Sequence, residues 1–133
     1  MRKSYEFYAK AENFLEGHKG YMQEEKVREL INQTGIQTFS RPVGIPENYN
    51  LKITKSGAGM EYIDPQNVHN SVRLMPGKSH SPLPHQQAPY VKQKINGHFV
   101  DKYGNKVPGD SPEAHIPVLE FNYTSEIKNS KGK

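Results

Sequence analysis

The sequence predicts an α+β fold, with helices in the first 50 residues and a twisted antiparallel sheet after them. Two observations lead to this prediction. Val27, Leu30 and Ile31 recur at the helical spacing of i, i+3 and i+4. From Leu51 onward the hydrophobic period becomes two, and short apolar stretches alternate with turn-forming Gly, Pro and Asn residues. Helices followed by a run of short strands are typical of the α+β class.

Two helices are expected in the first part of the chain. A weak amphipathic pattern between Tyr5 and Gly17 predicts the first. The second is predicted over residues 23–33 and ends before the next glycine. Glu24 and Glu25 lie in its first turn, where the helix dipole favours acidic side chains.

The second part of the chain is expected to form the sheet. Alternating or β-branched stretches bounded by turn formers predict strands at 51–55, 60–63, 71–75, 90–95, 98–102 and 116–121. The three prolines of residues 79–89 predict a loop there. At 133 residues the chain has the length of one domain. We divide it into a helical segment (1–50), a sheet that carries the active site (51–124) and a flexible tail (125–133).

Composition excludes several classes of protein. The chain has no cysteine, which excludes disulfide and zinc-thiolate scaffolds. No apolar run approaches the roughly 20 residues that a membrane span needs, and the basic start lacks the apolar stretch of a signal peptide. Residues 1–50 hold seven Lys/Arg and seven Asp/Glu, whereas residues 51–133 hold eleven and seven, so the net charge of +4 arises in the second part. This charge fits a polyanionic partner such as nucleic acid, or else a generally basic solvated surface.

The sequence favours chemistry without a metal or a cofactor. The acidic residues after position 50 are scattered, and no D-x-D or H-E-x-x-H arrangement occurs among them. There is no cysteine nucleophile, no Gly-x-Ser-x-Gly elbow and no phosphate-binding glycine motif of the nucleotide enzymes. Histidine, lysine, arginine and tyrosine remain. These suffice to cleave RNA, because the 2′-hydroxyl is an internal nucleophile that needs only proton transfer and charge neutralisation.

Individual residues are candidates for these roles, each with a structural alternative. Arg73 is flanked by apolar residues on an expected strand, so it faces away from the core. There it is either a phosphate ligand or an ordinary solvated arginine. His115 precedes an expected strand and serves in proton transfer or in a structural hydrogen bond. Tyr90 and Lys92 share one face of a strand, where Tyr90 contacts a base or phosphate or is simply half-buried. Further candidates for substrate contact lie in loops or turns: Lys55, His69, His80, His85, His98, Gln86 and Gln87.

A long, ordered set of motifs resembles a family of C-terminal toxin domains of bacterial polymorphic toxins, such as the LXG, Rhs and contact-dependent inhibition types. The resemblance covers residues 51–121. Its motifs are Asp64–Asn67, Val72–Gly77, Ser81–Pro82, Gln87–Lys92, Gly97, Asp101, Gly104–Asn105 and Ser111–Pro117.

The resemblance implies a toxin nuclease that is delivered, as part of a larger secreted protein, into the cytoplasm of a target cell. A cognate immunity protein would neutralise it in the producing cell. The order of helices and strands is also similar to the barnase, EndoU, colicin and RelE group, whose members cleave RNA without a metal. This likeness is an analogy of fold. The matched polar residues are Arg73, Ser81, Gln87, Tyr90, Lys92, Glu113 and His115. His80 and His85 depart from the pattern, and we expect them to tune substrate binding.

We therefore expect a monomeric, metal-independent ribonuclease. His115 would transfer one proton, Arg73 and Lys92 would neutralise the phosphate, Tyr90 would contact base or phosphate, and Gln87 would orient the substrate. Contacts to substrate are also assigned to Lys55, Ser81, His69, His85 and Glu113.

Three questions stay open from the sequence. The second proton-transfer group is either His69 or Glu113. The activity is alternatively that of a magnesium-dependent DNase toxin, or the domain binds nucleic acid without cleaving it. A third alternative is that His115 and Arg73 have no catalytic role and only connect loops. An acidic immunity protein is expected to cover the face that carries Arg73 and Lys92.

Overall fold

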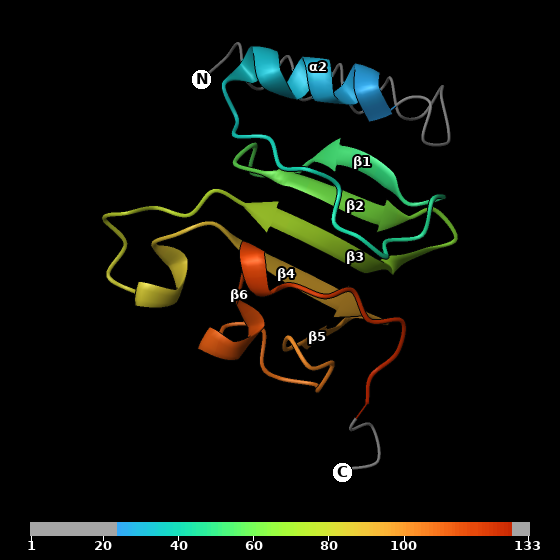
Figure 1. Cartoon of the computed structure of the whole chain (residues 1–133), viewed down its shortest axis with the longest axis vertical. Helices are drawn as coiled ribbons and strands as arrows, with labels where there is room; N and C mark the ends of the chain where they lie inside the picture. Colours follow the sequence, from blue (N-terminus) through green and yellow to red (C-terminus); the bar gives the residue numbers. More distant parts are fainter. Residues whose placement is uncertain (1–23, 129–133) are drawn as a thin grey trace.

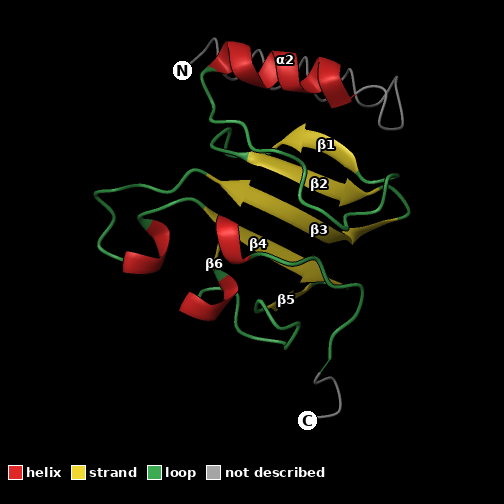
Figure 2. Cartoon of the chain, in the orientation of Figure 1, coloured by secondary structure: helices red, strands yellow, loops and turns green. Residues whose placement is uncertain are grey.

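The computed structural model describes residues 24–128. The helix expected between Tyr5 and Gly17 and the last five residues of the expected tail lie outside this range. The described residues form one α-helix followed by a six-stranded antiparallel sheet, which confirms the predicted α+β class (Figures 1 and 2). The elements are α2 (Glu24–Thr34), β1 (Asn50–Ile53), β2 (Met60–Asp64), β3 (Asn67–Met75), β4 (Tyr90–Ile95), β5 (His98–Val100) and β6 (Ile116–Pro117), with 3₁₀ turns η2 (Pro84–Gln86), η3 (Pro112–Ala114) and η4 (Val118–Glu120).

The sheet has the strand order β1-β2-β3-β4-β5, with β6 also paired to β4. β5 pairs with the residues near the end of β4, from Gln93 to Ile95. β6 pairs with its first two residues, because Tyr90 lies opposite Pro117 and Val91 lies opposite Ile116. Two short strands therefore share one edge of β4, and the chain just before β6 lies at the start of β4.

The hydrophobic core lies on the face of the sheet that is covered by α2 and by residues of the segments 36–49 and 118–123. Val27 and Ile31, four residues apart on α2, are fully buried. They pack with the inward residues of the strands, which alternate along each strand as a half-buried sheet requires. These core residues of the sheet are Leu51, Ile53, Met60, Tyr62, Val72, Leu74 and Val91.

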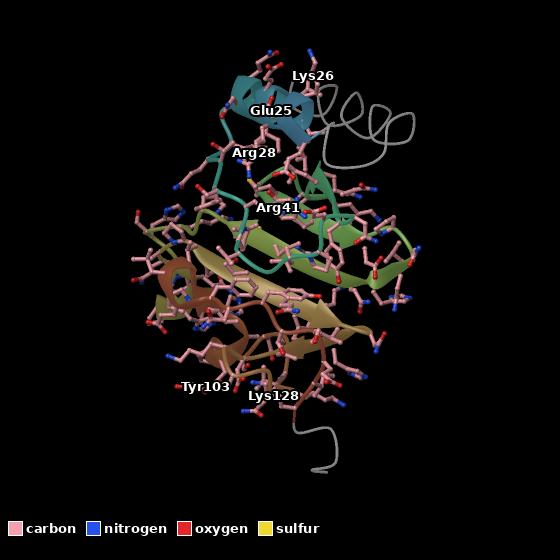
Figure 3. The ribbon with its side chains drawn as sticks, turned by 45° about the vertical axis from the view of Figure 1, so that its right-hand side comes forward. Glu25, Lys26, Arg28, Arg41, Tyr103 and Lys128 are labelled. Atoms are coloured by element: carbon pink, nitrogen blue, oxygen red, sulfur yellow. The ribbon has the colours of Figure 1, made fainter. Side chains whose placement is uncertain are left out.

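A charged network joins α2 to the sheet. The Tyr62 hydroxyl donates a hydrogen bond of 2.7 Å to the Glu24 carboxylate and accepts one of 2.8 Å from Arg28. Arg41 also pairs with Glu24 and lies over the Tyr62 ring. Arg28 and Arg41 lie where α2 meets the sheet, whereas Tyr103 and Lys128 lie at the opposite end of the molecule (Figure 3). Burial of Tyr62 together with the Glu24 hydrogen bond raises the pKa of its hydroxyl, so the tyrosine stays neutral.

Strand boundaries differ from the predictions by two residues or more in four places. β1 ends at Ile53 rather than at residue 55. β3 begins at Asn67, four residues before the predicted strand. β5 ends at Val100 rather than at residue 102. The strand predicted over 116–121 is wrong beyond Pro117, since residues 118–120 form η4 and the Phe121 N–H donates to the Val118 carbonyl. Pro117 has no N–H to continue a ladder, which accounts for the early end of β6.

Candidate active site

The face of the sheet that points away from α2 carries a row of charged side chains. In the strand register Lys52 lies opposite Glu61, Glu61 opposite Arg73, and Arg73 opposite Lys92, so four adjacent strands contribute one residue each. Neighbouring strands lie about 4.8 Å apart. Three cations and one carboxylate are therefore held within a short distance across β1 to β4, where a phosphate chain would be attracted.

Glu61 is the residue of this row that sequence reasoning missed. The alternation of β2 predicts that it faces solvent, yet its exposed fraction is only 8%. Its carboxylate accepts a hydrogen bond of 3.4 Å from Arg73. Lys52, Glu61, Arg73 and Lys92 all face outward in the alternation of their strands. This shared position places Glu61 in the row only once the register between the strands is known.

Arg73 and Lys92 form the cationic centre of the row. The Nε of Arg73 is buried and has no hydrogen-bond partner among residues 24–128. Burial, followed by the charge of Arg73, lowers the pKa of Lys92. The Lys92 ammonium lies 4.5 Å from the centroid of the Phe99 ring. Because two positive charges lie side by side, an anion bound between them would offset their repulsion.

His115 is brought to this face by β6 and η3. Ser111 caps η3 by accepting the Ala114 N–H, and β6 follows at once along the edge of β4. The His115 ring thereby lies 4.8 Å from the ring of Tyr90, measured between centroids. Tyr90 is two residues before Lys92 on β4, so His115 stands directly beside the charged row.

The hydrogen bonds of His115 fix its neutral tautomer. Its Nδ1 lies 2.8 Å from the Ser111 carbonyl oxygen, which only accepts, so Nδ1 carries the hydrogen. Nε2 is therefore the basic nitrogen of the neutral ring. Burial lowers the pKa of His115 most strongly, while its hydrogen bond to the Ser111 carbonyl opposes that effect. The charges of Lys92 and His85 lower the pKa further, and Asp110 raises it.

The loop between β3 and β4 places His85 and Gln86 against His115. The rings of His85 and His115 are 4.5 Å apart between centroids, in an edge-on arrangement. The Gln86 side-chain nitrogen lies 3.5 Å from Nε2 of His115, at the outer limit of a hydrogen bond. His85 Nε2 is buried and lacks a hydrogen-bond partner within the described residues. His115 is therefore enclosed by Tyr90, His85 and Gln86.

Ser81 and Gln87 hold this loop together. The Gln87 amide donates to the Ser81 carbonyl at 2.8 Å, and the Ser81 hydroxyl accepts the Leu83 N–H at 3.1 Å. Both residues thus support the segment that carries His85 and Gln86. Their contacts to a substrate stay a prediction.

Three other predicted residues lie apart from the cluster or at its margin. His69 is six residues from Met75 along β3, roughly 20 Å at about 3.3 Å per residue, and Met75 is the residue opposite Tyr90. Lys55 is exposed in the turn between β1 and β2. Glu113 is exposed on η3 and lines a small cavity that His115 also lines. Distance thus removes His69 from the reach of His115, whereas Glu113 stays beside it.

Between Glu24 and Lys128, no group of three or more His, Cys, Asp or Glu side chains is close enough to hold a metal ion. In the same range, no helix is long and apolar enough to cross a membrane.

Comparison with known proteins adds no relative: no family model, no curated protein and no solved structure matches the chain.

Proposed function

We propose that this domain is a metal-independent ribonuclease. The observation that carries the proposal is the contact between His115 and Tyr90 beside the neighbouring cations Arg73 and Lys92. RNA brings its own nucleophile, so these groups match what its cleavage requires: a proton-transfer group next to a site that neutralises phosphate. The excess positive charge of residues 51–133 supports a polyanionic substrate.

In this mechanism the scissile phosphate binds between Arg73 and Lys92. Their charges stabilise the extra negative charge that develops on phosphorus oxygens in the transition state. The Arg73 side chain is 37% exposed although its Nε is buried, so the exposed part of its guanidinium contacts the phosphate. Burial lowers the pKa of Lys92, and a bound phosphate would oppose that effect because a negative neighbour favours the charged ammonium.

The two proton transfers fall to groups on either side of this phosphate. An in-line attack needs the base near the 2′-hydroxyl and the acid near the leaving 5′-oxygen, on opposite sides of phosphorus. Along the sheet, Glu61 lies on one side of Arg73, and Lys92 lies on the other. We assign Glu61 as the base that takes the 2′-hydroxyl proton. His115, in its protonated form, is the acid that gives a proton from Nε2 to the leaving oxygen.

The biological setting follows from the resemblance of residues 51–121 to toxin domains. We propose that the domain acts in the cytoplasm of a target cell as part of a delivered polymorphic toxin, and that an acidic immunity protein covers the Arg73–Lys92 face. Co-expression of the domain with a candidate acidic immunity protein tests this. The expected result is that the partner protein restores growth, and that formation of the complex requires Arg73 and Lys92. A complex whose footprint avoids both residues contradicts the assignment.

The test of the activity is cleavage of total RNA and of plasmid DNA, each with and without EDTA. Cleavage of RNA that EDTA does not inhibit is the expected result. Magnesium-dependent nicking of DNA with intact RNA would instead support a DNase. Salt-dependent binding of both nucleic acids without cleavage would support a binding module.

A further inference from the structure

A pocket opens beside the candidate active site, at the end of the sheet where β3 leaves and β4 begins. Its cavity volume is about 210 Å³. A cavity of about 150 Å³ is large enough for benzene, so this one has room for a single planar heterocycle. Its lining includes Ser56 and Ala58 from the β1–β2 turn, Met75 from β3, Lys78 and Gln86 from the following loop, and Tyr90 from β4.

The chemistry of the lining suits a nucleobase. Tyr90 and Met75, which lie opposite each other on β4 and β3, supply an aromatic ring and a polarizable thioether for a flat ring to contact. The Gln86 amide and the Ser56 hydroxyl offer donors and acceptors for the edge of a base. Lys78 is exposed, and its positive charge would attract the phosphate of a bound nucleotide.

The walls of the pocket are held in place before any ligand binds. Gly77 has a φ of +79°, and a Cβ there would come within 2.5 Å of the Ala88 backbone, so the two ends of the loop meet closely. The Lys78 N–H donates to the Gln86 carbonyl at 2.8 Å. On the other side, a Cβ at Gly59 would fall 2.7 Å from the Met75 sulfur. A preorganised pocket loses less entropy when it orders a ligand.

Two lining residues also touch His115. Tyr90 lies 4.8 Å from it between ring centroids, and the Gln86 nitrogen lies 3.5 Å from its Nε2. A group in the pocket would therefore be an immediate neighbour of the phosphate that His115 serves. We propose that the pocket binds one base of the RNA, the base attached to a nucleotide that flanks the scissile phosphate; this rests on the proposed ribonuclease function.

The experiment measures binding of the four ribonucleoside 3′-monophosphates to the wild-type protein by calorimetry and by amide shifts in NMR spectra. Ribose 5-phosphate and inorganic phosphate serve as ligands without a base. The variant Ala58→Leu fills the pocket without a change of charge. Gln66→Leu is its matched control, because Gln66 is exposed in the β2–β3 turn and does not line the pocket.

At least one nucleotide is expected to bind about tenfold more tightly than ribose 5-phosphate, the size of one base stacked on an aromatic ring. Its shifts should centre on Ala58, Gly77 and Gln86. Ala58→Leu should remove this gain and keep the affinity for inorganic phosphate, and Gln66→Leu should behave as wild type. Equal affinity for nucleotide and ribose phosphate, or shifts located elsewhere, would overturn the proposal.

The subsite and the ribonuclease function fail separately. If the protein cleaves RNA but shows no base-dependent binding, the subsite is wrong and the proposed function stands. If base-dependent binding maps to the pocket while RNA stays intact, the pocket is a nucleotide site and the proposed function is wrong.

Discussion

Glu61→Gln separates catalysis from stability at the candidate base. The exchange removes the negative charge and keeps the size of the side chain and an oxygen that accepts from Arg73. The Glu61–Arg73 pair is long, at 3.4 Å, and its two side chains are 10% and 37% exposed. Its loss therefore costs about as much as that of an exposed pair, roughly 0.2–1 kcal/mol of unfolding free energy. Loss of a general base reduces the rate by about 10²–10⁴-fold.

The assay is single-turnover cleavage of a labelled RNA in EDTA, with thermal unfolding of each variant measured in the same buffer. The expected result is a rate at least about 100-fold lower and a melting temperature within a few degrees of wild type. Glu47→Gln, an equal change of charge at an exposed position outside the row, should keep the wild-type rate. A Glu61→Gln rate within about threefold of wild type would refute the role of Glu61 as base.

Three further outcomes are expected. Lys92→Met should raise the pKa of His115 in an NMR titration, because a positive neighbour disfavours the imidazolium, whereas Lys94→Met should not; an unchanged or lower value after Lys92→Met contradicts the proposed geometry. Gly77→Ala should lower the melting temperature more than Gly97→Ala does. Both glycines have positive φ, but only a Cβ at Gly77 would clash with backbone atoms, those of Ala88. Equal decreases in melting temperature would show that the loop can relax around the added Cβ. Tyr62→Phe removes the hydroxyl that bonds to Glu24 and Arg28. It should lower the free energy of unfolding in urea by about 1.5–3 kcal/mol and leave cleavage unchanged. An unaltered urea midpoint would show that the charged network does not stabilise the fold.

The pKa of His115 also sets the direction of the pH dependence. Its folded pKa lies below the unfolded value near 6.5, so the native state binds fewer protons between the two values. Stability should therefore fall as the pH decreases through this window, and His115→Asn should flatten that dependence. As an acid, His115 must be protonated, so kcat/KM should decline as the pH rises above its lowered pKa. A plateau that extends well above pH 7 would argue against this role.

The strand and helix pattern was predictable because it depends on local alternation. The period-two stretches of β1, β2 and β4 and the helical spacing of Val27 and Ile31 are local properties, and the structure reproduces them within a few residues. The turn at Asn96–Gly97 was equally readable, since both residues adopt positive φ as a tight hairpin turn requires. The early end of β6 was not predicted. It depends on the pairing of β6 with β4, which Pro117 ends and which the local sequence pattern does not reveal.

The grouping of site residues was only partly predictable. Arg73, Tyr90 and Lys92 could be assigned to the outward face from alternation alone. The meeting of His115 with Tyr90 depends on β6 returning to β4, a pairing between distant segments. The burial of Glu61 and the position of Gln86 against His115 depend on contacts across strands and loops, which composition and spacing do not encode.

The most direct test of the central claim uses one RNA oligonucleotide and its 2′-deoxy counterpart, each incubated in EDTA with wild-type protein or with His115→Ala. We expect that wild type cleaves only the RNA, and that the variant remains folded and cleaves it about 10²–10⁴-fold more slowly. Cleavage of the deoxy strand at a similar rate, or an undiminished rate with His115→Ala, would contradict it.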